Sequence, residues 1–146
     1  MKKDLFLYLA FGYIGVTTEV FFTAIAQIIH SLEKGQQVDL GFKGVSWMWM
    51  FPIYGLVSVF FPIVNKFVKN NHFLLRGLVY GIVLIMVEFV MGALLDFITG
   101  SCPWDYKTGW QIKGYVRIDF LPWWAFFCLM NEKIYLFLDK HVVLPR

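Results

Sequence analysis

Four long apolar stretches constrain what this chain can fold into. Leu5–Ile29 and Phe73–Ile98 are each long enough to cross about 30 Å of hydrocarbon at about 1.5 Å per residue. Val45–Val64 and Phe120–Leu138 are shorter but also long enough to span. Hydrophobic residues make up 59% of the 146 residues and charged residues 16%, more apolar surface than a soluble domain this small could bury. Because the stretches lack the alternation of barrel strands, we predict an all-α, polytopic integral membrane protein with four transmembrane helices.

Basic residues predict the orientation of these helices. They are more frequent at the two ends and in the middle connection than in the opposing loops, at Lys2, Lys3, Lys66, Lys69, Arg76, Lys140 and Arg146. Both termini are therefore predicted to be cytoplasmic, in the cell membrane. The basic start resembles a signal peptide, but the first apolar run is too long and Glu19 interrupts it, so we expect a retained helix. The net charge of +3 fits contact with anionic membrane lipids, and no basic motif indicates nucleic acid.

An internal repeat organises the chain as a single transmembrane domain over residues 1–146. The segment Phe42–Pro52 aligns with Ile112–Pro122 at an offset of 70, with Lys, Gly and Pro matching in order, and Glu19 aligns with Glu88 at an offset of 69. We predict two tandem two-helix repeats, about 5–68 and about 73–140, each a helix, a polar outer loop and a second helix. Because each repeat has two spans, both repeats have the same orientation in the membrane. A pseudo-twofold axis along the membrane normal would relate them. Pro52 and Pro122, near the starts of the returning spans, are interpreted as tolerated kinks.

Glu19 and Glu88 each lie near the middle of a long apolar run, where an ionised carboxylate is costly. Polar and small residues recur at every fourth position around them, so each acid shares a helix face with such residues: Gly15, Thr23 and Gln27, and Gly92, Asp96 and Gly100. One interpretation is a site near the bilayer midplane that shares a proton, binds a cation or holds a polar head group. The other is that both acids only hydrogen-bond across the helix bundle.

The predicted outer loop after the third span contains Cys102-Pro103-Trp104-Asp105-Tyr106. Its aromatic residues are typical of the membrane interface. Asp105 could cap a turn, or it could pair with a basic residue in a gate or head-group pocket, the candidates being Lys43, Lys113 and Arg117. Cys102 and Cys128 indicate neither a disulfide framework nor a metal cluster, and no cofactor is predicted.

Several segments resemble the CmpB-like family of small membrane proteins, especially its transmembrane protein 229 branch. The segments that carry the resemblance are Gly15-Val16-Thr17-Thr18-Glu19, Pro52-Ile53-Tyr54-Gly55, Glu88-Phe89-Val90-Met91-Gly92 and Cys102-Pro103-Trp104-Asp105-Tyr106. The broader group is labelled an ABC-transporter type IV permease. The resemblance implies that ten positions matter: Glu19, Pro52, Tyr54, Gly55, Glu88, Gly92, Trp104, Asp105, Tyr106 and Gly114. The chain has no phosphate-binding Gly-Lys-Ser/Thr loop, so ATP-driven transport would need a separate ATPase.

Three functions remain open from the sequence. The first is a membrane protein that binds or helps to move a lipid, a cation or a proton, as a homo-oligomer or with a partner membrane subunit. Its ligand would lie among Glu19, Thr23, Tyr54, Glu88, Trp104, Asp105 and Tyr106, with structural support from Pro52, Gly55, Gly92, Gly114 and Pro122. The second is an intramembrane enzyme that uses Glu19 and Glu88 as acid and base on a lipid or isoprenoid. The third is an accessory or scaffold subunit.

Overall fold

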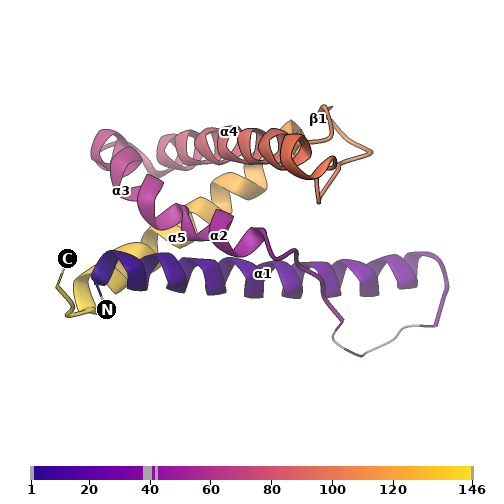
Figure 1. The fold of residues 1–146 in the computed structure, drawn as a ribbon, viewed down its shortest axis with the longest axis horizontal. Coiled ribbons are helices and arrows are strands. Elements are labelled where there is room, and N and C mark those ends of the chain that lie inside the picture. Colours follow the sequence, from indigo (N-terminus) through magenta and orange to yellow (C-terminus); the bar gives the residue numbers. More distant parts are fainter. Residues whose placement is uncertain (1, 38–40, 42, 146) are drawn as a thin grey trace. The chain divides into compact units, whose positions relative to one another are not determined.

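The computed structural model describes residues 2–37, 41 and 43–145, and these residues are mostly helical (Figure 1). The elements are α1 (Lys3–Glu33), α2 (Met50–Gly55), α3 (Val57–Val68), α4 (Phe73–Thr99), β1 (Gln111–Ile112), β2 (Val116–Arg117), the 3-10 helix η1 (Ile118–Phe120) and α5 (Leu121–His141). Phe42, the first residue of the predicted repeat segment, and Arg146, one of the basic residues that predict orientation, lie outside the described residues. The chain forms two compact units, unit 1 (Met1–Val59 with Leu144–Arg146) and unit 2 (Phe60–Val143).

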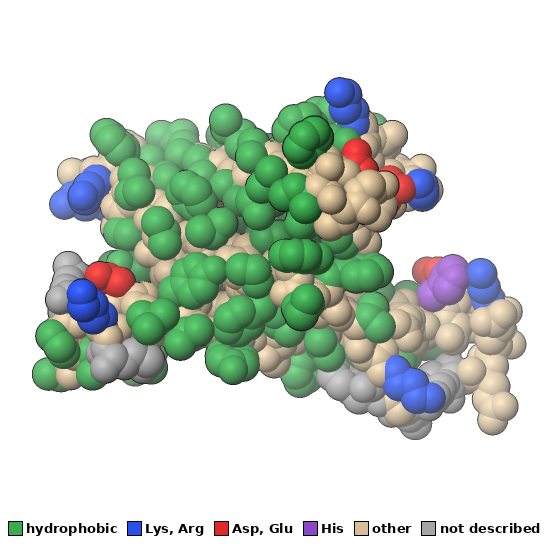
Figure 2. All heavy atoms as spheres, viewed as in Figure 1, with side chains coloured by type: hydrophobic (Ala, Val, Ile, Leu, Met, Phe, Trp, Pro, Cys, Tyr) green, Lys and Arg blue, Asp and Glu red, His purple; other side chains and the backbone are tan. Residues whose placement is uncertain are grey.

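Three helical stretches are long and apolar enough to cross a membrane: Lys3–Glu33, Met50–Val68 and Phe73–Thr99. Only 17%, 28% and 22% of their most apolar windows are buried, so most of this apolar surface is exposed, which is consistent with a membrane protein. Figure 2 shows hydrophobic side chains along both long helices, α1 and α4, with charged side chains near the helix ends. The helix at the fourth predicted span, α5, does not meet the same criterion among the described residues, because Asn131, Glu132 and Lys133 interrupt it.

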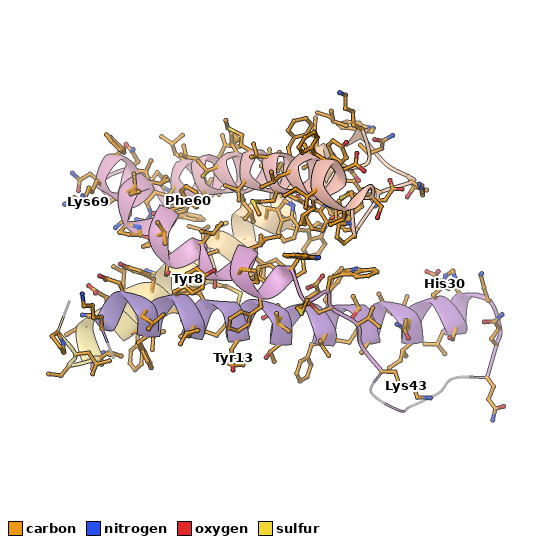
Figure 3. The ribbon with its side chains drawn as sticks, in the orientation of Figure 1. Tyr8, Tyr13, His30, Lys43, Phe60 and Lys69 are labelled. Carbon is orange, nitrogen blue, oxygen red and sulfur yellow. The ribbon has the colours of Figure 1, made fainter. Side chains whose placement is uncertain are left out.

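In unit 1, small residues let α2 pack closely against α1. A Cβ atom on Gly12 would lie 3.0 Å from the Phe51 ring and from the Phe51 carbonyl oxygen, and one on Gly55 would lie 2.7 Å from the Tyr8 ring. The Tyr8 hydroxyl donates to the Pro52 carbonyl (3.1 Å), and Tyr8 lies on the side of α1 that faces α2 (Figure 3). The two helices can approach this closely because glycine leaves the space that a side chain would fill.

The second predicted span is broken at Leu56, which separates α2 from α3. Its backbone N–H bonds to both Pro52 and Ile53, and the Ser58 hydroxyl satisfies the Gly55 carbonyl (2.8 Å). The break between α2 and α3 lies four residues after Pro52. Pro52 and Pro122 both lie in the first turn of their helices, where a missing N–H leaves no helical bond broken.

In unit 2, α5 packs along the first half of α4. Cβ atoms on Gly77 and Gly81 would each lie 2.9 Å from a leucine of α5, Leu129 and Leu121 respectively, and both glycines also approach Ala125. Gly77 meets the later residue of α5 and Gly81 the earlier one, so the helices are antiparallel. The second half of α4 is consequently left for the connecting loop to cover.

The loop that joins α4 to α5 (101–117) folds back along α4. The Tyr115 ring packs against Phe89 at 5.7 Å between centroids, and Tyr115 Cβ would lie 2.9 Å from a Cβ on Gly92. The loop contains a hairpin in which Ile112 pairs with Val116 and Gln111 with Arg117. Its turn has positive φ at Lys113 and Gly114. Glycine adopts this conformation without strain. The expected polar outer loop is therefore a structured segment that reaches as far as Glu88.

Candidate functional site

The Glu19 carboxylate lies in unit 1, near the middle of α1, and has two hydroxyl groups beside it. Ser46 donates its hydroxyl proton to Glu19 Oε2 at 2.6 Å. The Tyr54 hydroxyl of α2 is a second hydrogen-bonding group for the same carboxylate. Glu19 and Tyr54, both predicted site residues, are thus brought together, whereas Ser46 was not predicted.

Thr23 and Gly44 hold the irregular segment that carries Ser46. The Thr23 hydroxyl accepts the backbone N–H of Val45 (2.9 Å) and lies within hydrogen-bonding distance of its carbonyl (3.0 Å). Gly44 lies so close to the Val20 carbonyl of α1 that a Cβ atom would collide with it. Thr23, predicted as a ligand residue, therefore satisfies backbone groups of the segment that begins the second predicted span. That span starts as irregular backbone and becomes helical only at Met50.

The Glu88 carboxylate lies in unit 2, near the middle of α4, and is partly surrounded by donors. The Tyr106 hydroxyl of the loop donates to Glu88 Oε1 at 2.9 Å, and the indole of Trp124 on α5 lies beside the carboxylate. Among the described residues, however, buried Glu88 Oε2 and buried Trp124 Nε1 have no partner with hydrogen-bonding geometry. About 16 Å of helix rise separates Glu88 from the end of α4 at Thr99, so Tyr106 comes from a loop that reaches deep along the helix.

The rest of the loop is fixed to α4 and to itself by polar contacts. The Tyr115 hydroxyl donates to Asp96 Oδ2 (2.6 Å), which holds the pKa of Tyr115 above its usual value of 10. The Trp104 indole donates to the Tyr115 carbonyl (2.8 Å), and the Tyr106 backbone N–H donates to the Gly114 carbonyl (2.9 Å). Trp104 and Gly114, predicted as ligand and structural residues respectively, thus position Tyr106.

Asp105 lies away from the Glu88 carboxylate and pairs with a neighbour. It is exposed and forms its ion pair with Lys107, while Arg117 pairs with Asp119. Of the possible partners Lys43, Lys113 and Arg117, Arg117 pairs with Asp119 instead, and the partner of Asp105 within the loop is Lys107, two residues away in sequence. The Asp105 side chain also lies against Gly114, where it leaves no room for a Cβ atom. This contact and the positive φ together explain why residue 114 is a glycine.

The ion pair of Arg117 and Asp119 closes the base of the hairpin. The Arg117 guanidinium lies 4.0 Å from the centre of the Phe120 ring, and Asp119 Oδ1 accepts the Trp110 backbone N–H at 3.0 Å. Hydrogen bonding to Arg117 is the largest cause that lowers the pKa of Asp119 below its usual value of 3.8, and the same contact raises the pKa of Arg117.

The lowered pKa of Asp119 makes the hairpin sensitive to acid. Because the folded state favours the ionised carboxylate, the stabilisation is complete above the usual pKa of 3.8 and is lost as the pH falls through the lower folded value. The amide proton resonance of Trp110 should therefore be constant down to about pH 4 and then move upfield in an NMR titration. Asp119→Asn should remove this transition. A transition that persists in the variant would assign it to another carboxyl group.

An ion pair that the sequence analysis did not predict joins α4 and α5. Arg76 Nη2 lies 3.0 Å from Glu132 Oε2, and the Glu132 side chain is only 4% exposed. Nearby on α4, the Tyr80 hydroxyl donates to Asn65 Oδ1 of α3 (3.0 Å), and Tyr80 packs on Phe61. In the sequence, Arg76 indicates only the orientation of the helices, because no helical spacing pairs residues 56 apart.

The remaining predicted positions are accounted for by packing. Gly55 and Gly92 are buried at close contacts with Tyr8 and Tyr115, Pro52 supplies a carbonyl to Tyr8, and Pro122 begins α5. No protein-family model matches this chain, and no solved structure matches it.

Proposed function

We propose that this chain is a small multi-pass membrane protein whose Glu19 and Glu88 form intramembrane carboxyl sites. At least one of these sites takes up and releases a proton while the protein binds or helps to move a lipid head group or a cation. The observation that carries the proposal is Glu88 itself. It lies near the middle of an apolar helix, with one oxygen held by Tyr106 and the other buried without a partner in the described part of the chain. An ionised oxygen in that position is costly, and protonation removes the cost.

A proton suits this site better than a metal ion. The groups beside Glu88 are the hydroxyl of Tyr106 and the indole N–H of Trp124, and an indole nitrogen can only donate. Hard cations instead require several oxygen ligands. A lipid head group or cation would therefore be recognised elsewhere on the protein, and Glu88 would contribute the exchangeable proton.

The two-repeat organisation is part of the same proposal, and contacts within the two units support it. Four contacts between α1 and its returning segment in unit 1 have counterparts in unit 2. Each counterpart is found by adding 69 to the residue number on α1 and 70 to the residue number on the returning segment. The pairs and their counterparts are Tyr8–Gly55 and Gly77–Ala125, Gly12–Phe51 and Gly81–Leu121, Glu19–Tyr54 and Glu88–Trp124, and Thr23–Val45 and Gly92–Tyr115. Four equivalent contacts favour a shared hairpin architecture in the two units. On this basis α5 is the fourth transmembrane helix, and the motifs around both acids favour a place in the CmpB-like family.

Infrared difference spectroscopy of the protein in lipid tests the proposal directly. Lowering the pH should produce the C=O band of a protonated carboxyl group, and Glu88→Gln should remove part of that band. Glu33→Gln is the matched control, because Glu33 is exposed at the end of α1, and its removal should leave the buried carboxyl band intact. If Glu19→Gln and Glu88→Gln both fold and keep the complete band, neither acid exchanges protons and the proposal fails.

A second candidate is favoured by the bonds that the two acids make to irregular segments. Ser46 is held by Glu19 and Tyr106 by Glu88, so both acids could serve only to fix the fold of a scaffold subunit. In that case the glutamine variants would unfold more readily, and no carboxyl band would respond to pH.

A further inference from the structure

The two units differ at two positions that contact the glutamate in unit 1 and that the offset of 70 makes equivalent in unit 2. In unit 1 the carboxylate of Glu19 meets two hydroxyl groups, from Ser46 and Tyr54. The offset of 70 that relates the returning segments puts valine and tryptophan at these positions in unit 2, Val116 and Trp124. Val116 is 1% exposed and lies on β2, beside Tyr115. Neither side chain carries a hydroxyl group.

This difference leaves one glutamate satisfied and the other short of a donor. Ser46 gives Glu19 Oε2 a 2.6 Å hydrogen bond, whereas Glu88 receives a hydroxyl bond only at Oε1, from Tyr106. Its Oε2 is buried and has no partner among the described residues. Hydrogen bonds to a carboxylate favour the charged form, and a buried oxygen without one favours binding of a proton.

Other charged groups of α4 and of the loop have partners other than Glu88. On α4, Asp96 accepts the Tyr115 hydroxyl (2.6 Å). In the loop, Asp105 pairs with Lys107 and Arg117 pairs with Asp119. Tyr106 is therefore the titratable group that the structure places against Glu88, with the Trp124 indole from α5.

We infer that Glu88 is the carboxyl group that exchanges protons, that Glu19 stays ionised as its fixed counterpart, and that Ser46 and Val116 determine the difference. The inference rests on the proposed function, since it states which of the two acids performs it. The proton is added to Glu88 Oε2 and leaves from the same atom. Tyr106 and Trp124 position the carboxyl group without taking the proton.

Labelling with dicyclohexylcarbodiimide, which reacts with protonated carboxyl groups in apolar surroundings, separates the two acids. The full-length protein in nanodiscs is labelled across a range of pH, and adducts are located by peptide mass spectrometry. We expect about tenfold more adduct at Glu88 than at Glu19, the factor that one hydrogen bond to a charged group confers. Equal labelling of the two glutamates would overturn the inference and leave the proposed function in place. Labelling of neither would overturn both.

Exchanging the residues between units tests the cause. Val116→Ser should lower the Glu88 adduct about tenfold, because it adds the hydroxyl group that Ser46 supplies in unit 1. Val116→Ala, which removes both methyl groups and adds no hydroxyl group, should not lower it. In the other unit, Ser46→Ala should raise the Glu19 adduct by a similar factor, and this variant tests the inference even if both changes at Val116 prevent folding. The inference would be overturned if Val116→Ser and Val116→Ala gave the same amount of adduct at Glu88. It would also be overturned if Ser46→Ala gave the same amount of adduct at Glu19 as the wild type.

Discussion

Replacement of Glu132 by Ala is expected to destabilise the protein by about 3–5 kcal/mol. The Glu132 side chain is 4% exposed and pairs with Arg76 across the interface of α4 and α5. Its removal leaves a guanidinium group, whose Nε already has no partner among the described residues, in a largely buried position. A buried charge that loses its partner keeps its desolvation cost and loses the attraction that offsets it.

The double variant Arg76→Met with Glu132→Leu separates the charge effect from the packing effect. Replacing both members of a buried pair by apolar residues of similar volume is often neutral, so we expect its unfolding midpoint to lie close to that of the wild type. Glu33→Ala is the control for loss of an exposed acid. The measurement is unfolding in mixed micelles of increasing sodium dodecyl sulfate content. If Glu132→Ala alone unfolded at the wild-type midpoint, the pair would not be buried as the structure has it.

Gly44→Ala should have the second large effect, because it blocks the return of the chain along α1. The added Cβ atom would collide with the Val20 carbonyl oxygen, which belongs to a helix backbone and cannot rotate away. We expect a cost at or above the upper end of the 1–3 kcal/mol that overpacking usually brings, roughly 3 kcal/mol. The displaced segment would also draw Ser46 away from Glu19 and Val45 away from Thr23.

Gly35→Ala provides the comparison for this variant in the same connection. Nothing lies within 4 Å of a Cβ atom at Gly35, and its φ of +62° adds only the local strain of a left-handed alanine, about 1–2 kcal/mol. Unfolding midpoints in the same micelle titration, with cysteine crosslinking between the returning segment and α1, measure the difference. Equal stability of the two variants would contradict the close approach of Gly44 to α1.

The long helices could be predicted from hydropathy because length and composition suffice for them. Leu5–Ile29 and Phe73–Ile98 correspond to α1 and α4, which extend only a few residues further. The second predicted span began too early, at Val45. Residues 45–49 are as apolar as a membrane-spanning helix, but the Thr23 side chain on α1 satisfies the backbone of Val45. Hydropathy cannot predict a hydrogen bond between residues so far apart in sequence.

The candidate site was predicted in part, for a similar reason. Glu19, Tyr54, Glu88 and Tyr106 were identified, but not that Tyr106 reaches Glu88, since the contact depends on how the loop folds back. Trp124 could have been found, because the offset of 70 applied to Tyr54 leads directly to it. Ser46 gave no signal of its own. It is one small polar residue among apolar neighbours, and its importance comes only from the 2.6 Å contact with Glu19.

The irregular segments that lie along α1 and α4 have a consequence for membrane insertion in the four-span arrangement that we propose. Outside helices, backbone N–H and C=O groups in hydrocarbon cost several kcal/mol each unless protein groups satisfy them. Val45 has its partner on α1, and the Tyr115 side chain is anchored to Asp96 of α4. In the four-span arrangement proposed above, we therefore expect each long helix to enter the bilayer before its returning segment, so that each half of the chain inserts as one hairpin.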